Sequence, residues 1–261
     1  MNARRMSFLG ALAVVMACSG GSSKGISVST RSVAAAQAAQ TAATGVTGGP
    51  GVTVDKVRMV VRRVSVEGAS CDASEDQGTS TTTTAVTTTS STTGTSDDTG
   101  TQEGSDGCAD EFNYGPYYLE LTGDALKGPV AFAFSAPVPA GTYEEVEIQV
   151  NTIPSGMAGT DAGLQAMASA HASIIVDGLL DAGTSTERAF TFSTPMAVEQ
   201  EREGQIVVGD TPANLTLDFD PSGWFTAPDG SRLDPNDPTN QGQILANIRA
   251  SLRLVKDGDG E

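Results

Sequence analysis

The chain has 261 residues, a formal net charge of −17 and three cysteines. So acidic a chain repels nucleic-acid phosphates, which excludes nucleic acid as a partner. The chain has one histidine, far in sequence from the cysteines. The thiols of Cys71 and Cys108 therefore lack the further ligands that a zinc site needs. No G-x-S-x-G, P-loop or dinucleotide-binding motif occurs, and these absences argue against the common enzyme classes.

The first segment, residues 1–17, is typical of an export signal. Arg4 and Arg5 precede an apolar run over residues 8–17, which is too short to span a bilayer. The run ends at Cys18, and its last four residues, "VMAC", resemble the lipobox of bacterial lipoproteins. The alternative is an ordinary cysteine in a cleaved leader.

The lipobox resemblance implies that Cys18 becomes the N-terminus and carries lipid. Several acyl chains together anchor a protein stably where one does not. Loss of the two leader arginines would make the net charge −19. Ser19 in place of an acidic residue implies, by analogy with known sorting rules, the outer membrane. The expected location is therefore exported and lipid-anchored, on the periplasmic or the surface side.

Residues 18–51 are rich in Gly, Ser and Ala and predict a flexible tether, with a short helix over residues 32–41. The folded domain is expected over residues 52–256, followed by an acidic tail over 257–261. If the Cys18 thiol carries the lipid, Cys71 and Cys108 remain as a pair in an oxidising compartment, which predicts a disulfide between them. It would close a Thr-rich loop, 72–107, whose composition is typical of disorder.

Alternating apolar residues predict strands through most of the domain. The first runs through Val57, Met59 and Val61 and then shifts phase to Val64 and Val66, which indicates a bulge. Further alternating runs are "YYLELTG" (117–123), "VAFAFS" (130–135) and "VEIQV" (146–150). In "VAFAFS", Val130, Phe132 and Phe134 form the expected apolar face.

The second half of the domain predicts one short helix or loop running into a strand over residues 161–178. Strands are then expected at 189–193, 196–199, 205–209 and 213–220. Asp237 and Pro238 are typical of a helix start, with Ile244, Leu245 and Ile248 on one face. A last strand alternates Ala250, Leu252 and Leu254. Helices do not alternate with strands, so the sequence predicts an all-β, antiparallel β-sandwich with one or two short helices.

The order of these motifs resembles a family of bacterial lipoproteins and secreted proteins called domain of unknown function 4382. The resemblance covers residues 52–255 and is most specific in "VPAGTYEEVEI" and "LTLDFD". It implies a prealbumin-like or immunoglobulin-like sandwich and carries no established activity. The Thr-rich loop and the insertion "PSGMAGTDAGLQAMASAHAS" depart from the family.

No catalytic constellation is visible in the sequence. His171 stands alone in a segment of small residues, and Glu145 and Glu147 alternate with Val146 and Ile148 as the wet side of a half-buried strand does. No cofactor is expected. The alternative is calcium held by hard oxygen ligands, for which the candidates are Asp218, Asp220, Asp229, Asp234, Asn236 and Asp237. These residues also suit turns.

Trp224, the only tryptophan, follows "DFDPSG" and either stacks on a sugar ring or caps the end of the core. The sequence thus predicts a non-enzymatic, lipid-anchored envelope module whose partners are the membrane and an unknown envelope protein or glycan. The alternative is a carbohydrate-binding or calcium-stabilised recognition domain that uses Trp224, Tyr114, Tyr117 or the acidic loops.

Overall fold

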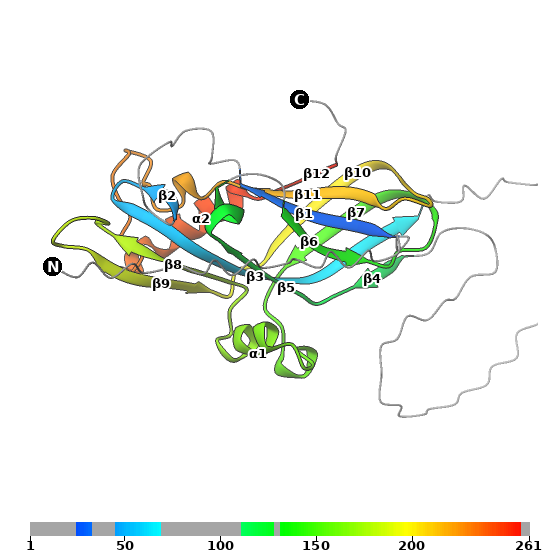
Figure 1. Ribbon diagram of the computed structural model, residues 1–261, viewed down its shortest axis with the longest axis horizontal. Coiled ribbons are helices and arrows are strands. Elements are labelled where there is room, and N and C mark those ends of the chain that lie inside the picture. The colour runs from blue at the N-terminus through cyan, green and yellow to red at the C-terminus, as the bar shows by residue number, and fades with distance from the viewer. Residues whose placement is uncertain (1–24, 33–44, 69–110, 128–130, 257–261) are drawn as a thin grey trace, which may run out of the picture.

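The computed structural model describes residues 25–32, 45–68, 111–127 and 131–256. These residues form two facing β-sheets with two short α-helices, so the predicted all-β sandwich is confirmed (Figure 1). The small sheet has the strand order β12 (Arg253–Lys256), β11 (Ala213–Phe219), β1 (Ile26–Ser32) and β6 (Ala131–Ala136). Its β1–β11 pair is parallel, which corrects the expectation of a wholly antiparallel sandwich.

The large sheet is built around β3 (Val52–Gly68), whose β-branched residues favour an extended chain. Its main order is β10 (Val198–Val208), β7 (Gly141–Val150), β3, β8 (Ile174–Leu180) and β9 (Arg188–Thr194). Three shorter strands also pair with β3: β2 (Val46–Gly49), β4 (Phe112–Tyr114) and β5 (Tyr117–Thr122).

β3 is long enough to pair with two successive strands along each of its edges. β7 pairs with its second half and β8 with its first half, and residues 151–173 leave the sheet between them. β4 and β5 are likewise separated by Gly115 and Pro116, which are joined by a cis peptide bond. The register of β3 against β7 shifts between Val61 and Arg63, which confirms the predicted bulge.

The main core lies between the sheets. The predicted inward residues of β3 and β7 are buried there, including Val57, Val64 and Ile148, each 0 % exposed. Full burial of such a side chain contributes about 1.5–3 kcal/mol. Phe134 also points inward, but Phe132 is 68 % exposed, so the expected inward face of this run is wrong at that residue. A register shift in β1 between Val28 and Ser29 places Phe132 opposite Ser29, on the outer side.

A second, smaller core lies on the outer face of the large sheet. There the excursion over residues 151–173, with η3 (Ser155–Met157) and α1 (Ala162–Ser169), covers Val60 and Ile175. Asp161 starts α1 by accepting a hydrogen bond from the Leu164 N–H at 2.8 Å. Figure 1 shows α1 below the sheet, on the side away from the small sheet. The predicted helix running into a strand is confirmed.

The expected tether over residues 18–51 is wrong for the described parts of that range. Residues 26–32 form β1, whose Ile26 and Val28 are 0 % exposed, and residues 46–49 form β2. The folded body therefore begins well before Val52. The alternation of apolar residues with Ser and Thr in "ISVSTRS" was the overlooked signal.

Two later boundaries also differ from expectation. The strands expected at 196–199 and 205–209 belong to one strand, β10, with an irregular register between Glu203 and Ile206. Near the end, Asp237 caps the short η5 (Pro238–Asn240), and α2 (Gln241–Ser251) follows it. Ala250 belongs to this helix, so the last strand begins only at Arg253. The short η2 (Gly123–Leu126) follows β5.

Several predictions fall outside the described residues: the signal peptide, Cys18, the helix after Ser32, the tail, and the Thr-rich loop with Cys71 and Cys108. β3 ends at Gly68, and its Val66 pairs with Phe112 of β4. The described residues on either side of the segment 69–110, Gly68 and Glu111, therefore lie at neighbouring strand ends. Each cysteine lies three residues along the chain from one of these ends, and the disulfide between them stays a prediction. Within the described part of the chain, no helix has the length and apolar character needed to cross a membrane.

Candidate functional site

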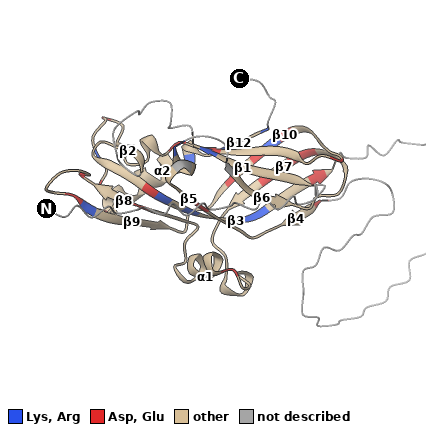
Figure 2. Ribbon diagram, in the orientation of Figure 1, with Lys and Arg blue, Asp and Glu red and all other residues tan. Residues whose placement is uncertain are grey.

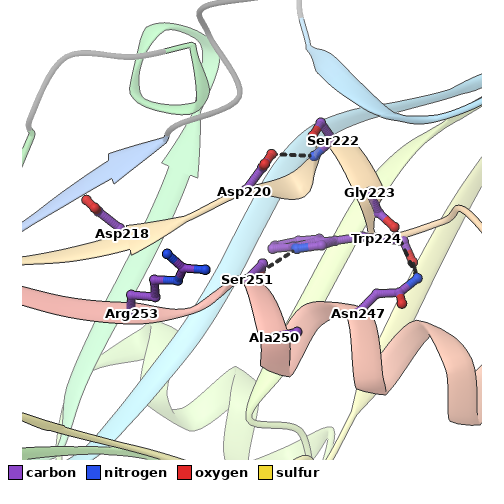
Figure 3. Close-up of a pocket in the computed structure, with 9 residues that line it drawn as sticks. All are labelled: Asp218, Asp220, Ser222, Gly223, Trp224, Asn247, Ala250, Ser251 and Arg253. Atoms are coloured by element: carbon purple, nitrogen blue, oxygen red, sulfur yellow. Dashed lines mark hydrogen bonds between the residues drawn. The ribbon is translucent and has the colours of Figure 1, made fainter.

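A pocket of about 460 Å³ opens where the small sheet meets α2 (Figure 3). Its walls come from the end of β11, the short η4 (Pro221–Gly223), the last turns of α2 and the start of β12. Three sequence-predicted residues, Asp218, Asp220 and Trp224, line it together. Their spacing in "DFDPSGW" places them here because a strand ends and a tight turn begins within that stretch.

Asp218 is committed to an ion pair. Its two oxygens accept hydrogen bonds from Nε and Nη2 of Arg31, each at 2.8 Å, and its residue is 8 % exposed. Arg31 lies directly across from it on the parallel strand β1, and Arg253 lies across from it on β12. A bidentate pair of this kind has fixed geometry, so it ties β1 to β11 beside the pocket.

Asp220 holds the turn that follows β11. Its Oδ1 accepts a hydrogen bond from the Ser222 N–H at 3.0 Å, and Pro221 takes the first helical position, where it has no donor to lose. This cap leaves the other carboxylate oxygen of Asp220 without a hydrogen bond from any described residue.

Trp224 is 0 % exposed and forms the floor of the pocket. Its ring packs against Phe219, and its indole N–H donates to Oγ of Ser251 at 2.7 Å, which in turn donates to the Ile248 carbonyl. The ring face is therefore not available for a sugar, and the predicted stacking role is corrected. The alternative, a tryptophan that caps the end of the core, is what the structure shows.

Asn247 joins the helix to the turn. Its Nδ2 donates to the carbonyls of Gly223, Trp224 and Thr226 at 3.1, 3.1 and 2.9 Å. These bonds close the pocket from the α2 side and fix its shape. Only a weak sequence signal indicates this role: Asn247 is a polar residue within an amphipathic helix. No local signal indicates the role of Arg31, because its partner Asp218 lies 187 residues away.

Arg253 is the exposed cation of the pocket. Figure 3 shows its guanidinium pointing into the space beside Asp218 and Asp220. It has no hydrogen bond or ion pair with any residue that the structure describes. Because no described residue uses its N–H groups, they can donate to a ligand.

The other residues of the predicted calcium set lie apart from this pocket and hold turns. Asp229 accepts from the Ser231 hydroxyl and N–H, and Asp237 from those of Thr239; these hydrogen bonds lower the pKa of both carboxyls. Asp234 accepts from the Asn236 N–H and pairs with Arg188. The six predicted ligands do not converge, and no group of three or more His, Cys, Asp or Glu side chains in the described ranges could hold a metal.

The remaining candidates have structural positions. Tyr117 stacks on Phe134 with ring centroids 4.1 Å apart, and the Tyr114 hydroxyl donates to the Pro137 carbonyl. His171 is exposed in the turn after α1, with a φ of 49°. None of the three lines the pocket at Trp224.

A second electrostatic feature covers the outer face of β3, β7 and β10. Glu145 lies directly between Glu67 and Glu203 in the sheet register, and Glu147 lies beside Glu201. Burial and the surrounding carboxylates raise the pKa of Glu145, and a hydrogen bond with Glu147 together with its charge raises that of Glu199. Figure 2 shows acidic residues at the end of the sandwich where β4, β7 and β10 are labelled.

Comparison with known proteins adds no relative: no family model, curated protein or solved structure matches the chain.

Proposed function

We propose that the protein is a non-enzymatic, lipid-anchored protein of the bacterial cell envelope, whose sandwich serves as a binding module. The observation that carries the proposal is the distance in sequence between anchor and fold. The apolar run ends at Cys18, and the core strand β1 begins at Ile26. The seven intervening residues span at most about 25 Å when fully extended. Such a module would stand close to the membrane.

The proposed anchor also orients the module. β1 begins opposite Ala136 and Ala213, at the end of the sandwich where β7 begins and β3 ends. The carboxylates on β3, β7 and β10 lie at this same end. They would face the membrane and, through repulsion of anionic head groups, keep the body from lying flat on it.

The state of the polar groups at the pocket supports binding. Asp218 is held by Arg31, Asp220 caps a turn, and Ser251 accepts from Trp224, so these groups build a fixed wall. A few polar groups held in fixed positions are typical of a binding site, where they orient the ligand. The resemblance to domain of unknown function 4382 belongs to the same proposal, since that family includes lipoproteins.

The test is the variant Cys18→Ser in a bacterial host that lipidates exported proteins. The wild-type chain should partition into the detergent phase and carry acyl chains by mass spectrometry, whereas the variant should remain uncleaved or appear as a soluble periplasmic protein. A Ser19→Ala variant serves as the matched control and should partition as wild type does. A wild-type chain that carries no acyl chains by mass spectrometry, or a Cys18→Ser variant that still carries them, would overturn the proposal.

A further inference from the structure

We infer that the pocket at Trp224 binds a small neutral saccharide through its hydroxyl groups. The first reason is that one wall of the pocket offers hydrogen-bond donors and another offers an acceptor. Arg253 offers only donors, and the free oxygen of Asp220 offers only an acceptor. A hydroxyl group both donates and accepts, so neighbouring hydroxyls on one ring satisfy both walls at once.

The second reason is the charge balance. Arg31 and Arg253 stand against Asp218 and Asp220, so the charges in and beside the pocket cancel. A ligand with a net charge would upset this balance, and an anion would also meet the repulsion of a chain with a net charge of −17. A neutral polar ligand avoids both costs.

The third reason is size and rigidity. A volume of about 460 Å³ lies within the range of about 300–1,000 Å³ found for small-molecule sites, and it accommodates one or two sugar rings. The Asp220 cap, the three hydrogen bonds of Asn247 and the buried Trp224 fix the walls before a ligand arrives. Preorganised walls lower the entropic cost of binding. Trp224 contributes here as a floor and not as a stacking surface.

The inference rests on the binding role proposed above but not on the lipid. Trp224 is the only tryptophan, so the full ¹⁵N-labelled chain gives a single indole N–H resonance from the pocket floor. Glucose, galactose, N-acetylglucosamine and maltose are titrated separately, with glycine as a zwitterionic probe and inorganic phosphate as an anionic probe. We expect a saturable shift of the indole resonance with at least one saccharide, in the millimolar range.

Two variants tie the shift to the walls. Arg253→Gln and Asp220→Asn, which keeps the oxygen that caps Ser222, should each weaken saccharide binding about tenfold. Arg62→Gln, which removes another arginine without a partner among the described residues, should bind as wild type does. No saturable shift with any of the four saccharides would overturn the inference, as would a shift with glycine or phosphate alone. Either result leaves the outcome for Cys18→Ser standing, so the two failures are distinguishable.

Discussion

The outer face of the large sheet has two halves that differ in what covers them. Over the first half of β3, together with β5 and β8, the α1 excursion buries Val60 and Ile175. Over the second half, with β7 and β10, the sheet carries Glu67, Glu145 and a row of further glutamates. One strand thus runs from a doubly buried environment into a wet one. On the outer face of β3, Val60 lies under the excursion; Arg58, before it, pairs with Asp177, and Glu67, near the end of the strand, is exposed.

This difference shows that the excursion is not an appendage. Where the chain leaves the sheet between β7 and β8, the excursion packs six buried residues against the sheet's outer face. The other half gains nothing of this kind, and it places like charges directly opposite each other, which destabilises a sheet. The covered half should therefore supply stability, and the uncovered half should reduce it.

The largest expected effect comes from opening the covered half. Ile175→Ala removes a side chain that is 6 % exposed beneath α1, and it should lower the free energy of unfolding by about 2–3 kcal/mol. Thermal unfolding should show a fall in Tm of about 4–12 °C. Val207→Ala, at a residue 57 % exposed, is the control and should change stability by less than about 0.5 kcal/mol. Equal behaviour of the two variants would mean that the excursion does not pack as described.

A smaller effect, of opposite sign, should come from the uncovered half. The pKa values of Glu145 and Glu199 are raised by folding, so these carboxyls favour the folded state below their ordinary value near 4.5. That contribution is lost as the pH rises through the raised values. The double variant Glu145→Gln, Glu199→Gln should therefore raise Tm at pH 7 by about 2 °C relative to wild type.

The pH dependence makes this second prediction specific. The difference in Tm between the double variant and wild type should shrink at pH 4, which lies below the raised pKa values of both carboxyls. Glu144→Gln is the control, because Glu144 is exposed on the same strand and has no residue directly opposite it in either register. A Tm difference that does not vary between pH 4 and pH 7 would show that repulsion between carboxylates is not its cause.

The smallest expected effect is that of calcium. Because Asp229, Asp234 and Asp237 already accept hydrogen bonds within their own turns, calcium has no converging set of ligands in the described ranges. Millimolar calcium should shift Tm no more than the same concentration of magnesium does. A calcium-specific rise in Tm, confirmed by heat released in calorimetry, would contradict this prediction and would mean that acidic residues of the chain bind calcium.

The sequence predicted the elements in which one periodicity dominates. Alternation located β5 and β7, and the phase shift located the bulge in β3, because both depend only on neighbours in the chain. It failed for β1, since seven residues between Gly-rich and Ala-rich stretches resemble a linker until a partner strand is known. That partner, β11, lies far along the chain.

The candidate site was predicted in part for the same reason. Asp218, Asp220 and Trp224 are close in sequence, so one local stretch places them together. Arg31 and Arg253 reach the same place only through the pairing of β11 with β1 and β12, which no local pattern contains. The buried state of Trp224 depends on α2, and this is why the stacking role could not be judged from the sequence.

The position of β1 also sets an order of events during synthesis. It is the first of the described strands to be made, yet one of its two neighbours, β11, follows 187 residues later. The N-terminal strand must therefore wait, unpaired on that edge, until nearly the whole chain exists. Contacts so distant in sequence slow folding. A chain that stops before β11 would still offer β6 to β1, but it would leave the other edge of β1 unpaired, so every incomplete product would expose a strand edge near its own beginning.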